Sequence, residues 1–331
     1  MRRFHILLAA GLLVWASGCA ATGVKTPVIH DTDIGDDIDD TWALGLLLKS
    51  PELDLKLVVG DQGKSEYRAK LIAKMLERAG RTDVPVGVGP DVNAQGDGPQ
   101  ADWVKGYSLD KYPGKVHRDG VQAIIDTIMK SPRPVTLICI GPVPNIGEAL
   151  KRQPAIAKKA RFVGMHGSVR KGYGGKATPD AEYNVRADAP ACRAAFTAAW
   201  DMTITPLDTC GLVHLTGEKY AKVRDSKDPI AQAIIENYRI WADKGQKNAA
   251  MAQDRSSTLF DTVAVYLAFA QSLTKMEQLP IIVDDKGFTH IDPTGGKMMS
   301  VATEWKDMGA FEDLLVARLT GVPASVAVGS R

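Results

Sequence analysis

Short apolar runs rich in β-branched residues alternate along this chain with longer stretches of helical periodicity. The runs predict strands at residues 28–31, 55–60, 135–140, 161–165 and 203–207. The stretches between them predict helices at residues 41–49, 65–79, 121–129 and 190–199. Such alternation is typical of βα units. We therefore expect an α/β fold with an open, mostly parallel sheet flanked by helices.

The second half of the chain predicts helices and one hairpin. Residues 228–241 and 257–270 have an amphipathic pattern, and Ser256 or Ser257 could cap the second helix. Lys286 and Gly287 lie between the apolar runs 281–283 and 288–290, which predicts a small late β-hairpin. No Pro/Gly/Ser-rich linker divides the chain, so we expect a single domain over residues 26–320.

The N-terminus has the pattern of an export signal. Two arginines precede an apolar stretch from Ile6 to Trp15, and small residues follow it before Cys19. Residues 1–18 therefore predict a signal peptide and an exported, periplasmic protein. Ala16-Ser17-Gly18-Cys19 resembles a bacterial lipobox, which would make Cys19 the lipidated first residue of the mature chain. Ordinary signal cleavage nearby is the alternative.

The charge balance argues against a nucleic-acid partner. The chain has 41 Lys and Arg and 39 Asp and Glu, and loss of residues 1–18 removes two arginines and no acid. The mature net charge is then about zero, without the basic surface that phosphate backbones require. We expect a small-molecule partner, contact with a membrane only through the N-terminal anchor, and leave a homo-oligomer open.

Three further cysteines have no metal-binding spacing. Cys139, Cys192 and Cys210 contain no CxxC pair, so we expect mostly buried, small apolar side chains. A disulfide between Cys192 and Cys210 is conceivable in an oxidising compartment.

The segment 31–40, DTDIGDDIDD, holds six carboxylates among ten residues and follows the first predicted strand. Like charges this close need a cation or a solvated surface, and their place at a strand end favours a cation site. Polar residues also follow other strands, at Asp61, Gly141 and Asp208. In open α/β sheets the ligand crevice lies at this carboxyl edge, so these residues can share one site.

The acidic segment fits three generic motifs poorly. An EF-hand fails, because its fifth position is Gly35 and its twelfth is Trp42. Asp31-Thr32-Asp33 weakly resembles the start of haloacid-dehalogenase-type phosphatases, in which Asp31 would be the nucleophile. The DDxxD string at residues 36–40 resembles that of prenyl-diphosphate synthases, but no second acidic motif follows.

A fourth resemblance covers much more of the chain. The segment DTDIGDDIDDTWALGLLL, from Asp31, resembles the N-terminal DxDPGxDDAxAL signature of nucleoside hydrolases, with Ile34 in place of Pro and two inserted residues. The segments VTLICIGPVPNIGEAL from Val135, AEYN from Ala181 and LFDTVAV from Leu259 resemble later family motifs in the same order. The chain thus resembles a divergent, exported bacterial member of the nucleoside hydrolase family, of the type that prefers inosine and uridine.

The resemblance implies calcium-dependent hydrolysis of the N-glycosidic bond of a nucleoside or related ribosyl compound. Asp39 would be the general base that activates water for attack on C1′, with inversion. The implied calcium ligands are Asp33, Asp37, Asp40, the backbone carbonyl of Ile140, and Asp261. The implied substrate-binding residues are Glu182, Asn184, Asp61 and Asn145.

Several of these residues have ordinary structural alternatives. Glu182 and Asn184 could cap a turn, Asp188 could cap a helix, and Asp261 could be a charge at a helix N-terminus. Where the family has a His that helps to protonate the leaving base, this chain has Phe260. A ribosyl-binding lipoprotein with a degenerate hydrolase site is therefore a second hypothesis.

Other side chains could substitute for the missing acid or hold the base. The histidines at positions 117, 166, 214 and 290 stay open as replacements, and His166 follows a predicted strand. Tyr173 or Trp103 could stack on a base. Lys176 stands near the place where the family has another ribose-contacting Asn.

Overall fold

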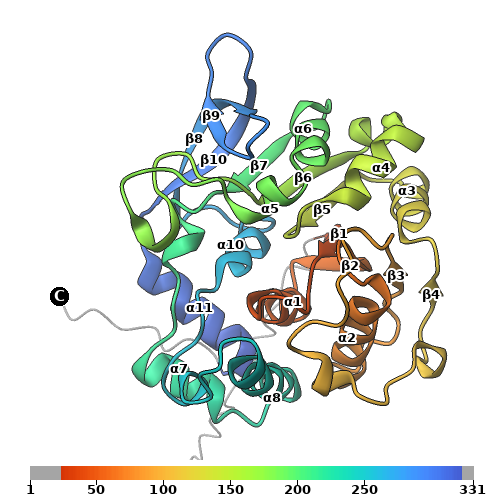
Figure 1. Cartoon of the computed structure of the whole chain (residues 1–331), viewed down its shortest axis with the longest axis vertical. Coiled ribbons are helices and arrows are strands. Elements are labelled where there is room, and N and C mark those ends of the chain that lie inside the picture. The colour runs from red at the N-terminus through yellow and green to blue at the C-terminus, as the bar shows by residue number, and fades with distance from the viewer. Residues whose placement is uncertain (1–23, 323–331) are drawn as a thin grey trace, which may run out of the picture.

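The computed structural model describes residues 24–322, and the predicted signal peptide and Cys19 lie outside the described residues. One ten-stranded sheet has the order β4-β3-β2-β1-β5-β6-β7-β10-β8-β9 (Figure 1). The strands are β1 (Thr26–Thr32), β2 (Leu53–Gly60), β3 (Val86–Val88), β4 (Val116–His117), β5 (Val135–Cys139), β6 (Ala160–Met165), β7 (Met202–Thr205), β8 (Thr274–Val283), β9 (Thr289–Ile291) and β10 (Lys297–Trp305). All pairs from β4 to β10 are parallel, and β8 pairs antiparallel with both β10 and β9. The expected mostly parallel sheet and late hairpin are confirmed.

β1 lies near the middle of the sheet, between β2 and β5. Asp31 pairs with Val59 on one side and with Cys139 on the other. Because these neighbours are parallel, their carboxyl ends meet at one edge of the sheet. The loops that follow β1, β2, β5 and β6 therefore lie together at that edge.

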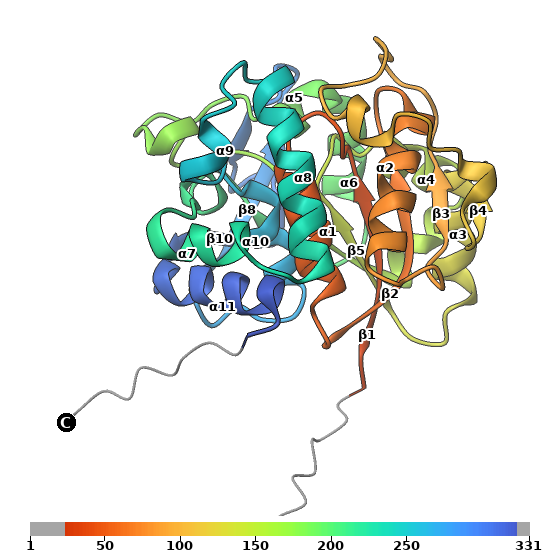
Figure 2. The ribbon, with the colours of Figure 1, turned by 90° about the horizontal axis from the view of Figure 1, so that it is seen from below.

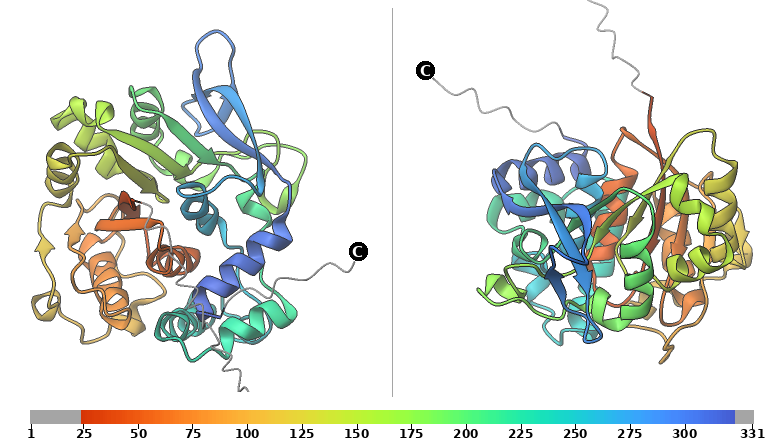
Figure 3. Two further views of the ribbon diagram at one scale, coloured as in Figure 1. Left: turned by 180° about the vertical axis from the view of Figure 1, so that it is seen from behind. Right: turned by 90° about the horizontal axis from the view of Figure 1, so that it is seen from above.

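Helices cover both faces of the sheet (Figure 2, Figure 3). They are α1 (Asp39–Leu48), α2 (Ser65–Arg78), α3 (Gly120–Lys130), α4 (Pro144–Arg152), α5 (Tyr183–Ala187), α6 (Ala189–Thr197), α7 (Gly217–Arg224), α8 (Pro229–Lys244), α9 (Met251–Asp254), α10 (Phe260–Leu267) and α11 (Met308–Thr320), with short 3-10 turns between them. The predicted helices at the positions of α1, α2, α3, α6 and α8 are present. Within residues 24–322, no helix is both long and apolar enough to cross a membrane.

Two separate apolar cores lie on the two faces. The core that includes Trp42 and Tyr238 joins the sheet to α1, α2, α8, α10 and α11. The core that includes Ile124 and Phe196 joins it to α3, α4 and α6. A parallel sheet buried on both faces requires nearly continuous apolar strands, which explains the uninterrupted runs in the sequence.

The prediction of buried, small apolar cysteine side chains is confirmed, since all three described cysteines are free and buried. The alternative disulfide does not form, because Cys192 belongs to one core and Cys210 to the other, and the sheet separates them. One helix boundary was predicted wrongly. The last predicted helix begins at Phe260 rather than near Ser257, because its N-cap residue is Leu259. Ser256 instead accepts a hydrogen bond from the backbone N–H of Leu215 at 2.9 Å, which fixes the neighbouring loop.

Candidate active site

A cavity of about 300 Å³ opens at the carboxyl edge of the sheet. Its floor comes from the loop after β1 and the first turns of α1 and α10, and its sides from the ends of β5 and β6 and from the segment around α5. The lining residues are Asp33, Asp36, Asp37, Asp39, Asp40, Ile140, Met165, Tyr173, Glu182, Tyr183, Asn184, Phe260 and Asp261. Segments far apart in sequence thus meet here. Asp61, Gly141 and Asp208, which follow other strands, are not among the lining residues.

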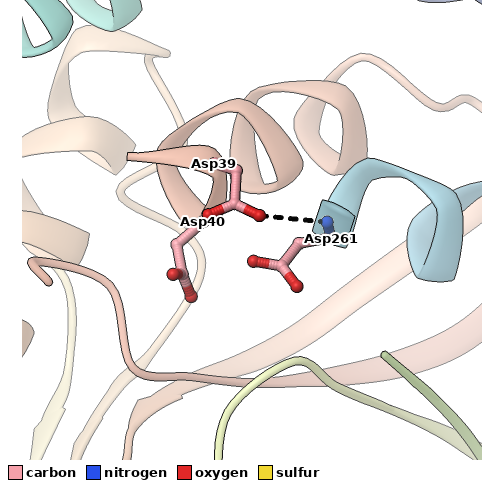
Figure 4. Close-up of side chains that lie close together, drawn as sticks. All are labelled: Asp39, Asp40 and Asp261. Atoms are coloured by element: carbon pink, nitrogen blue, oxygen red, sulfur yellow. Dashed lines mark hydrogen bonds between the residues drawn. The ribbon is translucent and has the colours of Figure 1, made fainter. Parts of the chain in front are cut away.

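Asp39, Asp40 and Asp261 form the tightest group in the cavity (Figure 4). Each offers a carboxylate oxygen, and the three oxygens lie within 4.8 Å of one another. The first two begin α1, and Asp261 lies in the first turn of α10. The backbone N–H of Asp261 donates to Asp39 Oδ2 at 3.3 Å. Burial, followed by the repulsion of neighbouring carboxylates, raises the pKa of Asp40 and Asp261 well above the ordinary value.

Asp33 and Asp37 line the same cavity but lie outside this group of three. Asp33 is buried. Burial of Asp40 is the largest cause that raises the pKa of Asp40, and the negative charge of Asp33 is the next largest. Asp37 is exposed, and its Oδ1 accepts a hydrogen bond from the backbone N–H of Ile38 at 2.7 Å. The two carboxylates therefore extend the acidic floor toward the cavity mouth.

The loop that carries Asp33 is fixed from behind by α2. Gly35 has a φ of +118°, and a Cβ at that position would lie 2.6 Å from the Tyr67 ring, so only glycine fits. The buried Arg68 guanidinium donates to the carbonyls of Gln62, Asp33 and Ile34 and to Asp36 Oδ2. Asp36 is thus exposed but paired.

The sugar-binding candidates Glu182 and Asn184 lie side by side on the cavity wall. Glu182 caps α5, since its carboxylate accepts from the backbone N–H groups of Gly167, Asn184 and Val185 at 2.8–3.2 Å. Burial raises the pKa of Glu182 to about 7. Asn184 Nδ2 donates to the carbonyl of Ile140 at 3.0 Å, which ties α5 to the end of β5.

Asp61 and Asn145 lie beneath the cavity, and neither is among the residues that line it. Asn145 Nδ2 donates to Asp31 Oδ1 at 2.6 Å, and Asp61 Oδ2 accepts from the backbone N–H of Val143 at 3.2 Å. Val143 has a φ of +60°, an unfavourable conformation for a β-branched residue. Asp61 therefore holds a strained turn after β5. Asp31 is fully buried, which leaves a phosphoryl substrate no access to this carboxylate.

Aromatic side chains also line the cavity. The rings of Phe260 and Tyr173 are in edge-to-face contact, with centroids 6.1 Å apart and planes at 81°. The hydroxyl of Tyr173 accepts from the backbone N–H of Tyr183 at 2.9 Å, so the ring is held in place. Trp103 does not line this cavity; it lies under Lys74 on α2.

None of the four candidate histidines is among the residues that line the cavity. His166 is buried between Phe162 and Phe196 and donates to the Gly141 carbonyl at 3.0 Å, and His290 pairs with Asp284. Lys176 pairs with Asp180 at 2.5 Å, outside the lining residues. Asp188 caps α6, as expected, by accepting from the N–H of Ala191.

The donors available to a metal ion are all oxygens. Buried carboxylates that raise one another's pKa concentrate negative charge that a bound cation would neutralise. Carboxylate and carbonyl oxygens suit hard cations such as calcium, and the donor set lacks the His and Cys ligands that favour zinc or copper. The residues present therefore fit a hard divalent cation.

Comparison with known proteins gives one consistent result. The sequence profile of the inosine-uridine preferring nucleoside hydrolase family matches residues 28–316. A probable uridine nucleosidase 2 of Oryza sativa subsp. japonica is 27% identical over 316 residues, which cover 91% of this chain and 90% of that protein. A pyrimidine-specific ribonucleoside hydrolase RihA of Citrobacter koseri is 28% identical over 315 residues, covering 88% and 97% of the two chains. The solved structure of the plant nucleoside hydrolase PpNRh1 superimposes with a TM-score of 0.72 at 23% identity, over 89% of this chain and 99% of that one.

Proposed function

Since this chain belongs to the inosine-uridine preferring nucleoside hydrolase family, we propose that it is a calcium-dependent N-ribohydrolase that uses Asp39 as its general base. The chain is an N-glycosyl hydrolase, and the bond that it cleaves joins C1′ of a nucleoside's sugar to a base nitrogen. The dependence on calcium and the roles of individual residues are what we propose.

The oxygen donors of the cavity floor support a calcium site. Asp33, Asp40 and Asp261, with the Ile140 carbonyl, would hold the ion, and Asp37 could supply a further oxygen. When bound, calcium supplies positive charge that neutralises the carboxylates and makes nearby water more acidic.

The protein side chains would divide the remaining work. Asp39 would take a proton from water as the water oxygen bonds to C1′ and the C1′–N bond breaks. Glu182 and Asn184 would bind sugar hydroxyls, since both residues line the cavity. The carboxylates would stabilise the positive charge that develops on the sugar ring. Attack by water without a covalent sugar intermediate would invert the configuration at C1′.

Asp61 and Asn145 would act on the substrate indirectly. They fix the turn after β5, and that turn positions the Ile140 carbonyl and the Asn184 amide next to each other. The observation that carries the proposal is the meeting of Asp39, Asp40 and Asp261 with Glu182 and Asn184 around one cavity.

Release of free ribose tests the proposal. Purified protein with calcium should liberate ribose from at least one member of a nucleoside panel, and Asp39→Asn should lower kcat by about 10²- to 10⁴-fold. Calcium affinity, measured by calorimetry, should fall less in Asp39→Asn than in Asp40→Asn or Asp261→Asn. Asp83→Asn, at an exposed carboxylate paired with Arg81, is the matched control. An Asp39→Asn variant with full turnover would contradict the assigned role.

The aromatic wall keeps a second function open, that of a ribosyl-binding lipoprotein with little turnover. A Phe at position 260, next to Asp261, leaves the departing base without a nearby acid. Calorimetry with calcium-loaded protein and a nucleoside panel separates the two: tight binding without ribose release favours the binding protein.

We also propose that the chain is exported to the periplasm and anchored through a lipid on Cys19, on the strength of its N-terminal sequence pattern. Labelled palmitate should be incorporated by the full chain but not by Cys19→Ser. Incorporation by both would contradict the anchor.

A further inference from the structure

The cavity has an acidic side and an aromatic side, and its lining contains no positive charge. All the charged residues among its lining are Asp or Glu. The neutral side is made by Phe260, Tyr173 and Tyr183, and the two tyrosines are partly exposed there. Within the described residues 24–322, no Lys, Arg or His side chain lines this cavity.

The carboxyl groups of this lining already have other partners or roles: both Glu182 oxygens accept backbone N–H groups, and Asp37 is counted among the proposed calcium ligands. The tyrosines are poorly suited to protonate a departing neutral base. The hydroxyl of Tyr173 accepts a hydrogen bond from the Tyr183 backbone, and burial raises the pKa of Tyr183 to about 12. Efficient general acids have a pKa near the working pH. His166 is fully buried beneath the cavity and bonded to the Gly141 carbonyl. A neutral base that leaves as an anion would therefore take its proton from solvent.

We propose that the preferred substrates are ribosides whose base carries a fixed positive charge, such as N-ribosylpyridinium compounds and ribosides of N7-alkylated purines. This inference rests on the proposed hydrolase function. In such a substrate the electron pair of the breaking C1′–N bond returns to the ring nitrogen and cancels its positive charge. Water supplies the new C1′–O bond and its proton goes to Asp39. The base leaves neutral and needs no proton.

The same lining would recognise a positively charged ring. Aromatic faces attract cations, and the edge-to-face contact of Phe260 with Tyr173 fixes both rings at the cavity. Asp37 is exposed and lines the cavity, so it adds negative potential there, whereas Arg68 offsets the charge of Asp36. The Arg68 guanidinium, which pairs with Asp36, is buried and is not among the residues that line the cavity.

A matched pair of substrates tests the preference. Guanosine and 7-methylguanosine differ by one methyl group, and at mildly acidic pH the methylated ring is a cation. We expect kcat/KM for 7-methylguanosine to exceed that for guanosine by at least about 10²-fold, the usual contribution of a general acid. Each rate is also divided by the spontaneous rate of that nucleoside, and a ratio of about tenfold should remain as recognition of the cation.

Two substitutions separate protonation from recognition. Phe260→His adds a proton donor at the cavity, so it should raise turnover of guanosine and lower that of 7-methylguanosine. Tyr173→Leu should raise KM for 7-methylguanosine by about tenfold and change KM for guanosine less. Phe269→His is the matched control, because Phe269 lies against Arg318 at the opposite edge of the sheet and should leave the ratio of the two substrates as it is.

The wild-type ratio decides the proposal even if a variant fails to fold. Equal efficiency for the two nucleosides after correction for spontaneous hydrolysis, or a preference for guanosine, would overturn the cationic-base inference and leave the hydrolase function intact. No ribose from any substrate would instead overturn the hydrolase function, and this inference with it.

Discussion

Arg68 gives the clearest case of a single residue that the acidic site depends on. Its side chain is 3% exposed and bonds to three carbonyls and one carboxylate of the loops after β1 and β2. Arg68→Met would leave these buried acceptors without donors, so we expect the free energy of unfolding to fall by about 3 kcal/mol. Chemical denaturation of the two proteins measures this difference in free energy of unfolding.

The same helix provides the control. Arg78 pairs with Glu236 through an exposed, two-pronged contact, and such surface pairs contribute only about 0–1 kcal/mol. Arg78→Met should therefore change stability little. Equal losses in the two variants would show that the loop contacts of Arg68 are unimportant.

At the residue scale, the resemblance to nucleoside hydrolases indicated Asp261, Glu182 and Asn184 as partners of the acidic segment, whereas the strand-end pattern indicated only that the acidic segment lies at the carboxyl edge of the sheet. The sequence did not predict that Arg68 is buried, since an arginine in an amphipathic helix is expected on the solvated face unless the position of the facing loop is known. The position of Asp61 below the cavity also depends on the left-handed backbone at Val143. A valine gives no sequence signal for that conformation, because β-branched residues rarely adopt it.

At the scale of elements, the late hairpin supports the sugar-binding side of the cavity. Thr289 on β9 both accepts from the backbone N–H of Ser168 and donates to its carbonyl, each at 2.9 Å. The adjacent Gly167 donates its N–H to Glu182. Thr289→Val should therefore lower the free energy of unfolding by about 1–3 kcal/mol and raise KM for ribosyl substrates.

Denaturation and steady-state kinetics together test this link, with Thr294→Val as the control. Thr294 is exposed in the turn before β10 and bonds only to Asp292. If Thr289→Val lowers stability but leaves KM at the wild-type value, the hairpin supports the fold without supporting the site.

The strong strand and helix patterns were predicted within a few residues, because burial on both faces leaves long apolar runs. The short strands β3 and β4 were missed, since two or three residues are too few to show a period. β10 was missed for another reason: KMMSVATEW has neither a strict alternation of polar and apolar residues nor an uninterrupted apolar run, and its parallel partner β7 comes from a distant part of the chain.

For the whole molecule, buried carboxylates make the metal-free protein sensitive to pH. Burial raises the pKa of Asp31 and of Glu182 to about 7 in the folded state, from 3.8 and 4.5. A raised carboxyl pKa contributes stability that is fully present below the unfolded value and is lost as pH rises through about 7. With a chelator present, the unfolding midpoint should fall by at least about 2 °C between about pH 5 and about pH 8.

Calcium should oppose this loss. At about 100 times its dissociation constant, a ligand that binds only the folded state adds about 2.7 kcal/mol. Thermal scans at both pH values, with chelator and with calcium, measure the effect. A midpoint that rises with pH in the metal-free protein would contradict it, as would calcium that leaves the midpoint at pH 8 unmoved.

Both ends of the described chain meet at the amino edge of the sheet. The backbone N–H of Thr26 donates to the Glu52 carbonyl at 2.9 Å, and Arg318 of α11 pairs with the Glu52 carboxylate (Figure 2). The cavity opens at the opposite edge. Immobilisation through either end, on a bead or as a fusion to a carrier, would thus leave the mouth facing free solution. The chain ends and the cavity mouth thus lie at opposite edges of the sheet, so attachment through either end fixes the orientation of the cavity relative to the support.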